Sequence, residues 1–299
     1  MGAVFEAVVG RLDAVVAERL AIPRAEAQRA IAEGRVLVDG AVRPKSFRLG
    51  GGERVAVELS GFGAPAAEET PVEIRHRDRY LLVISKPAGL PTHPTQGRRT
   101  GTLVNRLLGM GVRLSKAGGP LRPGIVHRLD AGTSGLMIVA CDDQTHAALA
   151  AMLGRHEIDR RYLALVRGIV EHDRFAVDAP LGRTGSRVHV HATAGRQAET
   201  RFETIERFQR ATLLEAAPRT GRTHQIRVHL SAVGHPIIGD AKYGGGGDEA
   251  RSLGLSRPFL HSYRLSFEHP RTGGRVEVED PLPPDLAEAL RRVRGEGSG

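Results

Sequence analysis

The chain has 299 residues, and its 43 lysines and arginines against 34 aspartates and glutamates give a formal net charge of +9 and a pI near 10.5. One cysteine excludes an intrachain disulfide or a multi-cysteine zinc site, and no apolar run approaches the length of a membrane span. The basic balance favours a polyanionic partner, either a nucleic acid or an anionic membrane surface. Because the N-terminus also lacks a secretory signal pattern, we expect a cytoplasmic protein.

The first 60 residues predict a small α+β domain. Apolar residues at helical spacing predict helices over Arg11–Leu20 and Arg24–Glu33. A short strand is expected over Arg35–Val38, and Asp39-Gly40 directly after it is a strong signal for a tight hairpin turn. The alternation of Arg54–Leu59 predicts a closing strand.

Residues 60–70 are rich in Gly, Ala, Pro and Glu, which is typical of a linker. We therefore predict a small domain over residues 1–60, a linker over 61–71 and a larger domain over 72–299. The larger domain has too few helices to alternate with strands, so we expect an α+β fold with a mixed, largely antiparallel sheet. The expected strands are Tyr80–Ser85, Leu136–Ala140, Tyr162–Val166, Thr200–Arg207, Thr212–Ala216 and Val276–Glu279. The expected helices are Asp142–Leu153, Thr223–Val233 and Pro284–Val293.

The densest polar cluster lies between Gly124 and Leu136 and runs into a strand of the buried type. An aspartate such as Asp130, in a turn of Gly, Thr and Ser beside a rigid strand, is well placed for chemistry. In the alternative reading Asp130 caps a turn, and His127 and Arg128 form a surface pair. Spacing alone leaves both readings open.

A second cluster spans Arg219–Leu230. Thr223 is expected to cap the helix that follows, and His224 and Arg227 share a face that could present a guanidinium to a carboxylate or phosphate. A solvated basic helix is the alternative. The inward stripe of this helix is expected to be Ile226, Leu230 and Val233.

The 13 histidines show no His-Glu-x-x-His pattern and no cysteine cluster beside them, so we expect no metal site. Cys141 follows an apolar strand and is expected to be a small buried residue.

Taken together, these clusters resemble the RluA family of RNA pseudouridine synthases over most of the chain. The segments that carry the resemblance are Lys86–Leu90, His93-Pro94, Thr102–Leu108, Gly124–Asp130, Thr133–Leu136, Arg161–Val166, Gly221–His229, Gly234–Gly244, Leu260-His261 and His269-Pro270. The first 60 residues resemble the RNA-binding domain named after ribosomal small-subunit protein four, through Arg11–Asp13, Arg24–Gln28 and Gly34–Gly40. Enzymes of the RluC and RluD kind have a similar arrangement. Ala131-Gly132 depart from the Lys-Asp that often follows the catalytic aspartate in the family.

The resemblance implies that the protein isomerises uridine to pseudouridine in RNA, with large-subunit (23S) ribosomal RNA as the expected substrate. Asp130 would be the catalytic carboxylate, Arg227 its partner, and Tyr162 the ring against a flipped-out base. Whether Asp130 attacks the sugar, attacks the uracil or acts as a base stays open. The residues expected to contact RNA are Arg128, His127, Lys86, Arg222, His224, Arg11, Arg24, Arg35 and Lys45.

No cofactor is expected, and the protein is expected to bind RNA as a monomer, without a membrane partner. One alternative is a transfer-RNA pseudouridine synthase of the same family, and another is a catalytically silent ribosome-assembly protein that binds RNA. A glycosidase would need a second well-placed carboxylate, which the sequence does not offer.

Overall fold

The computed structural model describes residues 2–20, 22, 24–58, 65–94, 99–119, 121–185, 187–191 and 195–295. Its contacts group the chain into two compact units, Met1–Pro71 with His93–Ile125, and Val72–Thr92 with Val126–Gly299. The predicted linker begins inside residues 59–64, which lie outside the described residues, so the limits 1–60, 61–71 and 72–299 stay a prediction. Among the described helices, none has the length and apolar character needed to span a bilayer.

The first unit contains the two predicted N-terminal helices, α1 (Leu12–Arg19) and α2 (Arg24–Ala32). They pack on a sheet whose strand order is β1-β6-β3-β4. These strands are β1 (Gly2–Glu6), β6 (Arg54–Glu58), β3 (Val36–Val38) and β4 (Ala41–Val42). The unit also contains β2 (Gly10–Arg11), β5 (Arg48–Leu49) and α3 (Leu103–Gly109).

The predicted hairpin turn is confirmed, because Asp39 and Gly40 both have positive φ, 49° and 78°, and join two antiparallel strands. The strand expected to end at Leu59 is described as far as Glu58, and Leu59 lies outside the described residues.

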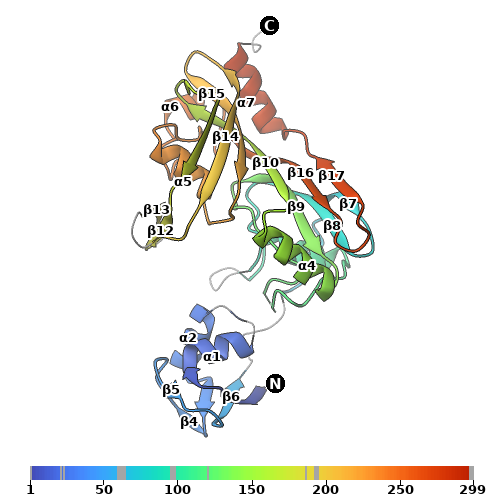
Figure 1. Ribbon diagram of the computed structural model, residues 1–299, viewed down its shortest axis with the longest axis vertical. Helices are drawn as coiled ribbons and strands as arrows, with labels where there is room; N and C mark the ends of the chain where they lie inside the picture. The colour runs from blue at the N-terminus through green and yellow to red at the C-terminus, as the bar shows by residue number, and fades with distance from the viewer. Residues whose placement is uncertain are drawn as a thin grey trace. The chain divides into compact units, whose positions relative to one another are not determined.

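In the second unit, the described residues form a nine-stranded sheet in the order β11-β14-β15-β10-β16-β9-β8-β7, with β17 paired to β16 (Figure 1). The pair β16–β9 is parallel and every other pair in this sheet is antiparallel, which confirms the predicted mixed, largely antiparallel α+β fold. The strands are β7 (Glu73–Arg77), β8 (Leu81–Lys86), β9 (Ser134–Ala140), β10 (Asp159–Arg167), β11 (Arg174–Asp178), β14 (Glu199–Arg207), β15 (Ala211–Pro218), β16 (Leu260–Glu268) and β17 (Arg275–Glu279). A separate hairpin pairs β12 (Leu181–Thr184) with β13 (Arg187–Val190).

The helices of this unit pack on different strands of the sheet. The helix α4 (Asp143–Gly154) lies beside β9, and α5 (Gln225–Ala232) lies beside β14 and β15 (Figure 1). Leu149 and Met152 of α4 pack with apolar side chains of β9 in one core cluster. The strand β9 is buried along its whole length, so Cys141 just after it is also buried, as predicted. The remaining helices are α6 (Asp248–Ser252) and α7 (Pro284–Arg294).

The start of α5 differs from the prediction. Thr223 does not cap the helix, because His224 holds the N-cap position in the left-handed region, with φ of 56°. The turn before it is closed by the Gln225 side chain, whose Oε1 accepts hydrogen bonds from the Thr220 hydroxyl (2.6 Å) and the Arg222 N–H (3.0 Å). Ile226 and Leu230 are buried as predicted, but Val233, just past the last helical residue, is 42% exposed.

The segment 127–133 enters β9 where this strand lies parallel to β16. Gly135 is opposite Ser262 in the register and has φ of 110°. A Cβ at this position would overlap the Ser262 backbone, so only glycine allows the two strands to approach. This close pairing fixes the position of the polar segment that precedes β9.

Candidate active site

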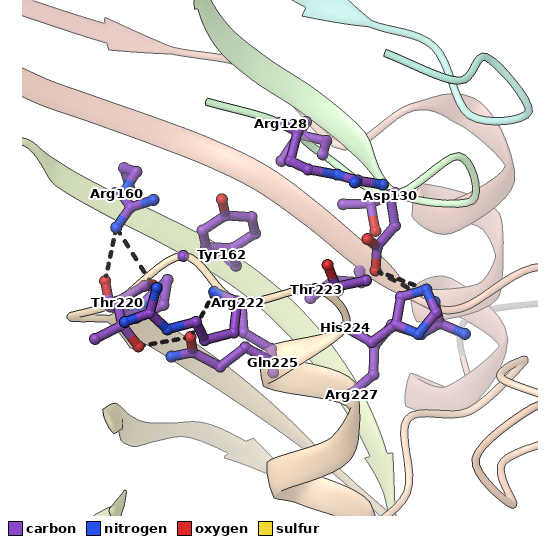
Figure 2. A pocket seen from close by; sticks show the side chains of 16 residues that line it. Arg128, Asp130, Arg160, Tyr162, Thr220, Arg222, Thr223, His224, Gln225 and Arg227 are labelled. Carbon is purple, nitrogen blue, oxygen red and sulfur yellow. Dashed lines mark hydrogen bonds and ion pairs between the residues drawn. The ribbon is translucent and has the colours of Figure 1, made fainter. Parts of the chain in front are cut away.

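A pocket in the second unit brings the two polar clusters of the sequence together (Figure 2). Its walls come from the segment before β9, from β10 and from the turn that leads into α5, and it contains a cavity of about 60 Å³. Six of the residues selected from the sequence line it: Asp130, Tyr162, Arg227, Arg128, Arg222 and His224. The alternatives of a turn cap and a solvated helix are therefore not needed to explain the two clusters.

Asp130 is held in place by a chain of charges. Arg227 donates Nη1–H to Oδ2 of Asp130 at 3.2 Å, and its Nε and Nη2 form a fork on Asp240 at 2.6 and 2.8 Å. The Asp130 side chain is 14% exposed and that of Asp240 is 1% exposed. Burial by itself lowers the pKa of Arg227, but the hydrogen bond and charge of Asp240, and then the charge of Asp130, raise it above its ordinary value. The guanidinium thus stays charged and aims one N–H at the Asp130 carboxylate.

Tyr243 contacts both Arg227 and His224 of this site. Its ring centroid lies 4.9 Å from Cζ of Arg227, within the range of a cation–π contact. Its hydroxyl is 2.7 Å from Nδ1 of His224, whose Nε2 is 3.9 Å from Asp130. Burial lowers the pKa of His224 more than the charge of Asp130 raises it. At neutral pH the imidazole is therefore mainly uncharged, and Arg227 is the principal counter-charge of Asp130.

The backbone at His224 is strained in order to make this contact. A residue other than glycine with φ of 56° costs about 1–3 kcal/mol. The turn closed by Gln225 and the hydrogen bond to Tyr243 keep the residue there. Strain of this kind is often found at functional sites, where the surrounding structure compensates for it.

Tyr162 forms another wall of the pocket from the middle of β10. The residue is 6% exposed, and burial raises the pKa of its hydroxyl, which remains protonated at neutral pH. Arg128 is exposed at the pocket, and Arg222 is tied by Nε–H to the carbonyl oxygen of Gln197 at 3.0 Å.

Lys86 and His127 do not have the positions expected of RNA-binding residues. Lys86 is fully buried, and its Nζ donates to the carbonyl oxygens of Pro87 (2.8 Å), Leu90 (2.9 Å) and Ala131 (3.4 Å). Nε2 of His127 accepts the backbone N–H of Ile138 in β9 at 2.9 Å. Burial, followed by the charge of Arg160, lowers the pKa of His127 to about 3, so this ring is neutral. Both side chains fasten the segment that contains Asp130 and offer no charge to an RNA backbone.

Burial lowers the pKa of Lys86 to about 7, against an opposing effect of Asp130. The unfolded chain then binds more protons than the folded one between about pH 7 and 10, so stability rises with pH in that window. We expect the stability difference between the wild type and Lys86→Met to shift in favour of the wild type by up to about 1.4 kcal/mol per pH unit. Urea unfolding of both proteins at pH 6, 7.5 and 9 measures this. A difference that stays constant over this range would mean that Lys86 remains protonated when buried.

The N-terminal residues expected to contact RNA lie in the first unit. Asp13 is fully buried, and Arg11 and Arg24 each place two hydrogen bonds on its carboxylate, at 3.1 and 3.3 Å and at 3.0 and 3.0 Å. Burial raises the pKa of Asp13, but the hydrogen bonds from Arg24, Arg11 and Gln28 outweigh it and hold this pKa well below its usual range. The side chains of Arg11 and Arg24 remain 44% and 51% exposed.

Arg35 and Lys45, the other two residues of this unit that are expected to contact RNA, differ from Arg11 and Arg24. Arg35 is paired with Glu33 and its side chain is only 13% exposed, while Lys45 is exposed.

Comparison with known proteins identifies the family. Residues 80–232 match the family described as RNA pseudouridylate synthase, and residues 10–55 match the S4 domain. The RNA pseudouridine synthase YlyB of Bacillus subtilis is 40% identical over 92% of this chain and 90% of its own length. The chain belongs to the RNA pseudouridylate synthase family. This confirms the resemblance stated from the sequence, and the chain is an RNA pseudouridine synthase with an N-terminal S4 domain.

Other members of the family are similar over most of their length. Ribosomal large subunit pseudouridine synthase D of Pseudomonas aeruginosa is 39% identical over 88% of this chain and 85% of its own. Among solved structures, human RNA pseudouridylate synthase domain containing 1 has a TM-score of 0.58 and 26% identity, covering 75% of this chain and 89% of that one. The pseudouridine synthase fold is thus shared with a solved relative.

Three residues of this pseudouridine synthase had no role predicted from the sequence: Arg160, which lines the pocket, and Asp240 and Tyr243, which contact Arg227. Asp240 and Tyr243 lie in a segment that carries the family resemblance, but no role was predicted for either residue. Arg160 lies directly before another such segment, and no spacing rule distinguishes it from Arg161 beside it.

Proposed function

We propose that this pseudouridine synthase isomerises specific uridines of large-subunit (23S) ribosomal RNA, with Asp130 as the catalytic group. The observation that carries the assignment of Asp130 is its carboxylate, which Arg227 holds at 3.2 Å and which is the one carboxylate among the described residues that line the pocket. The ribosomal target is supported by relatives named ribosomal large subunit pseudouridine synthase D, at 38–42% identity.

The chemistry needs a carboxylate and a fixed geometry. The N1–C1′ bond of the uridine breaks, the uracil turns in the pocket, and C5 bonds to C1′. C5 then loses its proton and N1 gains one, so the reaction is an isomerisation without an oxidant or reductant. Asp130 acts in its ionised form, with the Arg227 guanidinium at 3.2 Å as its counter-charge.

The reacting atoms of a stacked nucleotide are hidden, so the uridine enters the pocket flipped out of its stack. In this proposal the ring of Tyr162 packs against the uracil, and the exposed Arg128 at the pocket contacts the RNA around the vacated position. Arg222 and His224 contribute to the wall next to the base.

The N-terminal 60 residues dock the RNA in this proposal, and the S4 match over residues 10–55 supports that role. Arg11 and Arg24 are anchored on one buried carboxylate while about half of each side chain stays exposed, at 44% and 51%, which suits contact with backbone phosphates. The protein is proposed to act as a monomer. A ribosomal substrate supports the expected cytoplasmic location.

A pseudouridine map of ribosomal and transfer RNA, from strains with and without the gene, tests the proposal. We expect one or more pseudouridines to disappear from 23S RNA alone and to return when the wild-type gene is restored. Loss confined to transfer RNA would replace the ribosomal target with the transfer-RNA alternative. An unchanged map in both pools would contradict the proposed activity in the cell.

A further inference from the structure

Arg160 is a buried cation in the wall of the active-site pocket. The residue is 8% exposed and lines the same pocket as Asp130. Its Nη2 donates to two neutral acceptors, the carbonyl oxygens of Pro218 (3.2 Å) and Thr220 (3.5 Å). Its Nε is buried without a hydrogen-bond partner, and among the described residues no carboxylate pairs with this guanidinium.

The neighbouring arginines show how unusual this is. Arg227 has Asp240 and Asp130 as counter-charges, within 3.2 Å. Arg161, next to Arg160 on β10, is paired with Asp159 and with Glu215, each at 2.8 Å. A buried charge without a counter-charge is expensive, and proteins normally pair such groups. An arginine kept unpaired in a pocket wall therefore indicates that a ligand supplies the negative charge.

The reaction itself creates such a charge. When the N1–C1′ bond breaks, its electron pair leaves with N1, and the uracil becomes an anion whose charge spreads over N1, O2 and O4. Figure 2 shows Arg160 and Asp130 on either side of Tyr162. A uracil packed on Tyr162 with its ribose at Asp130 would extend toward Arg160.

We propose that Arg160 is a further catalytic residue, which binds a carbonyl oxygen of the flipped uracil and stabilises the negative charge that develops on the ring. The inference rests on the proposed role of this pocket in holding the flipped uridine. A half-turn of the uracil that brings C5 to C1′ exchanges the positions of O2 and O4. Arg160 therefore meets a carbonyl oxygen before and after the turn. A fixed donor aimed at charge that appears in the transition state lowers the barrier more than it tightens binding.

The test compares Arg160→Gln and Arg160→Lys with Arg161→Gln, a matched control whose guanidinium has its own counter-ions outside the pocket. Each full-length protein reacts in single turnover with a transcript that contains the target uridine, taken from whichever RNA the pseudouridine map identifies. We expect Arg160→Gln to lower the maximal rate about 100- to 1000-fold, with little change in the half-saturating concentration. Arg160→Lys keeps the charge, so its maximal rate should be at least about tenfold higher than that of Arg160→Gln. Arg161→Gln should stay within about twofold of the wild type.

Two results would overturn the inference. The first is a maximal rate within about threefold of the wild type for folded Arg160→Gln. The second is a loss confined to the half-saturating concentration, with the slope of log affinity against log salt reduced by about one, which is the signature of a phosphate contact. Thermal unfolding of each variant shows whether it is folded. If Arg160→Gln does not fold, the maximal rate and half-saturating concentration of Arg160→Lys are compared with those of the wild type instead. If the wild type forms no pseudouridine in any RNA, the proposed function fails, whereas a normal wild type with an unaffected Arg160→Gln removes only the role of Arg160.

Discussion

Replacing Asp130 by Asn is expected to abolish pseudouridine formation, with the single-turnover rate falling at least about a thousandfold. Asn has the size of Asp and can still accept the hydrogen bond from Arg227, so the pocket keeps its shape. What it lacks is the ionised oxygen that acts on the nucleotide. RNA affinity should change by less than about threefold, since the proposed contacts of the arginines with the RNA backbone are untouched. Quantification of pseudouridine in the transcript and a filter-binding titration measure the two quantities.

Asp159→Asn is the matched control for this experiment. Asp159 stands at the start of β10 with its side chain 39% exposed, and it pairs with Arg161 at 2.8 Å. The control should therefore react at close to the wild-type rate. An Asp130→Asn protein that still forms pseudouridine at a normal rate would show that another group performs the chemistry.

Replacing Asp240 by Asn is expected to damage both stability and rate. Asp240 is 1% exposed and carries two of the hydrogen bonds of Arg227, so its neutralisation leaves the Arg227 guanidinium with Asp130 as its remaining carboxylate partner. Breaking a buried pair by removing one partner costs about 3–5 kcal/mol of folding free energy. The freed guanidinium should also pull Asp130 away from its productive direction, and the maximal rate should fall about 100-fold. Urea unfolding and single-turnover kinetics measure the two effects.

The double variant Asp240→Asn with Arg227→Met separates the two roles of Asp240. Removing the Arg227 guanidinium should recover part of the lost stability, because the buried cation that lost its two hydrogen bonds to Asp240 is then gone. The rate should stay low, because Asp130 has lost the N–H that orients it. A single Asp240→Asn variant that loses stability but keeps a rate within about threefold of the wild type would limit Asp240 to a structural role.

Much of the fold could be predicted from local patterns. The helix Asp142–Leu153 agrees with α4 to within a residue at each end, since Asp142 caps it by accepting the N–H of Thr145 at 2.9 Å. The continuous apolar run Leu136–Ala140 is the buried strand β9. Such patterns can be predicted because the cap and the apolar run each lie within a few consecutive residues.

The start of α5 shows where local rules end. A threonine before an apolar stripe is a good candidate for a cap, yet His224 takes that position with positive φ. One contact that compensates for the strain is the hydrogen bond between His224 and Tyr243, 19 residues away. The residues next to Thr223 in the sequence therefore do not reveal that His224 takes the cap position.

The sequence by itself determined the family, the strand-rich α+β class and the candidate carboxylate Asp130, because these depend on the order and type of residues along the chain. The tertiary structure decided which charges meet. Asp130 and Arg227 are 97 residues apart, and they meet through the close passage of β9 and β16 at Gly135 and the packing of α5 on β14 and β15. It also decided that Lys86 donates hydrogen bonds to backbone carbonyl oxygens of its own unit, and that Arg160 faces the pocket with no carboxylate partner among the residues that the structure describes. Burial and pairing are properties of neighbours in space, so charged residues that look equivalent in sequence acquire different roles.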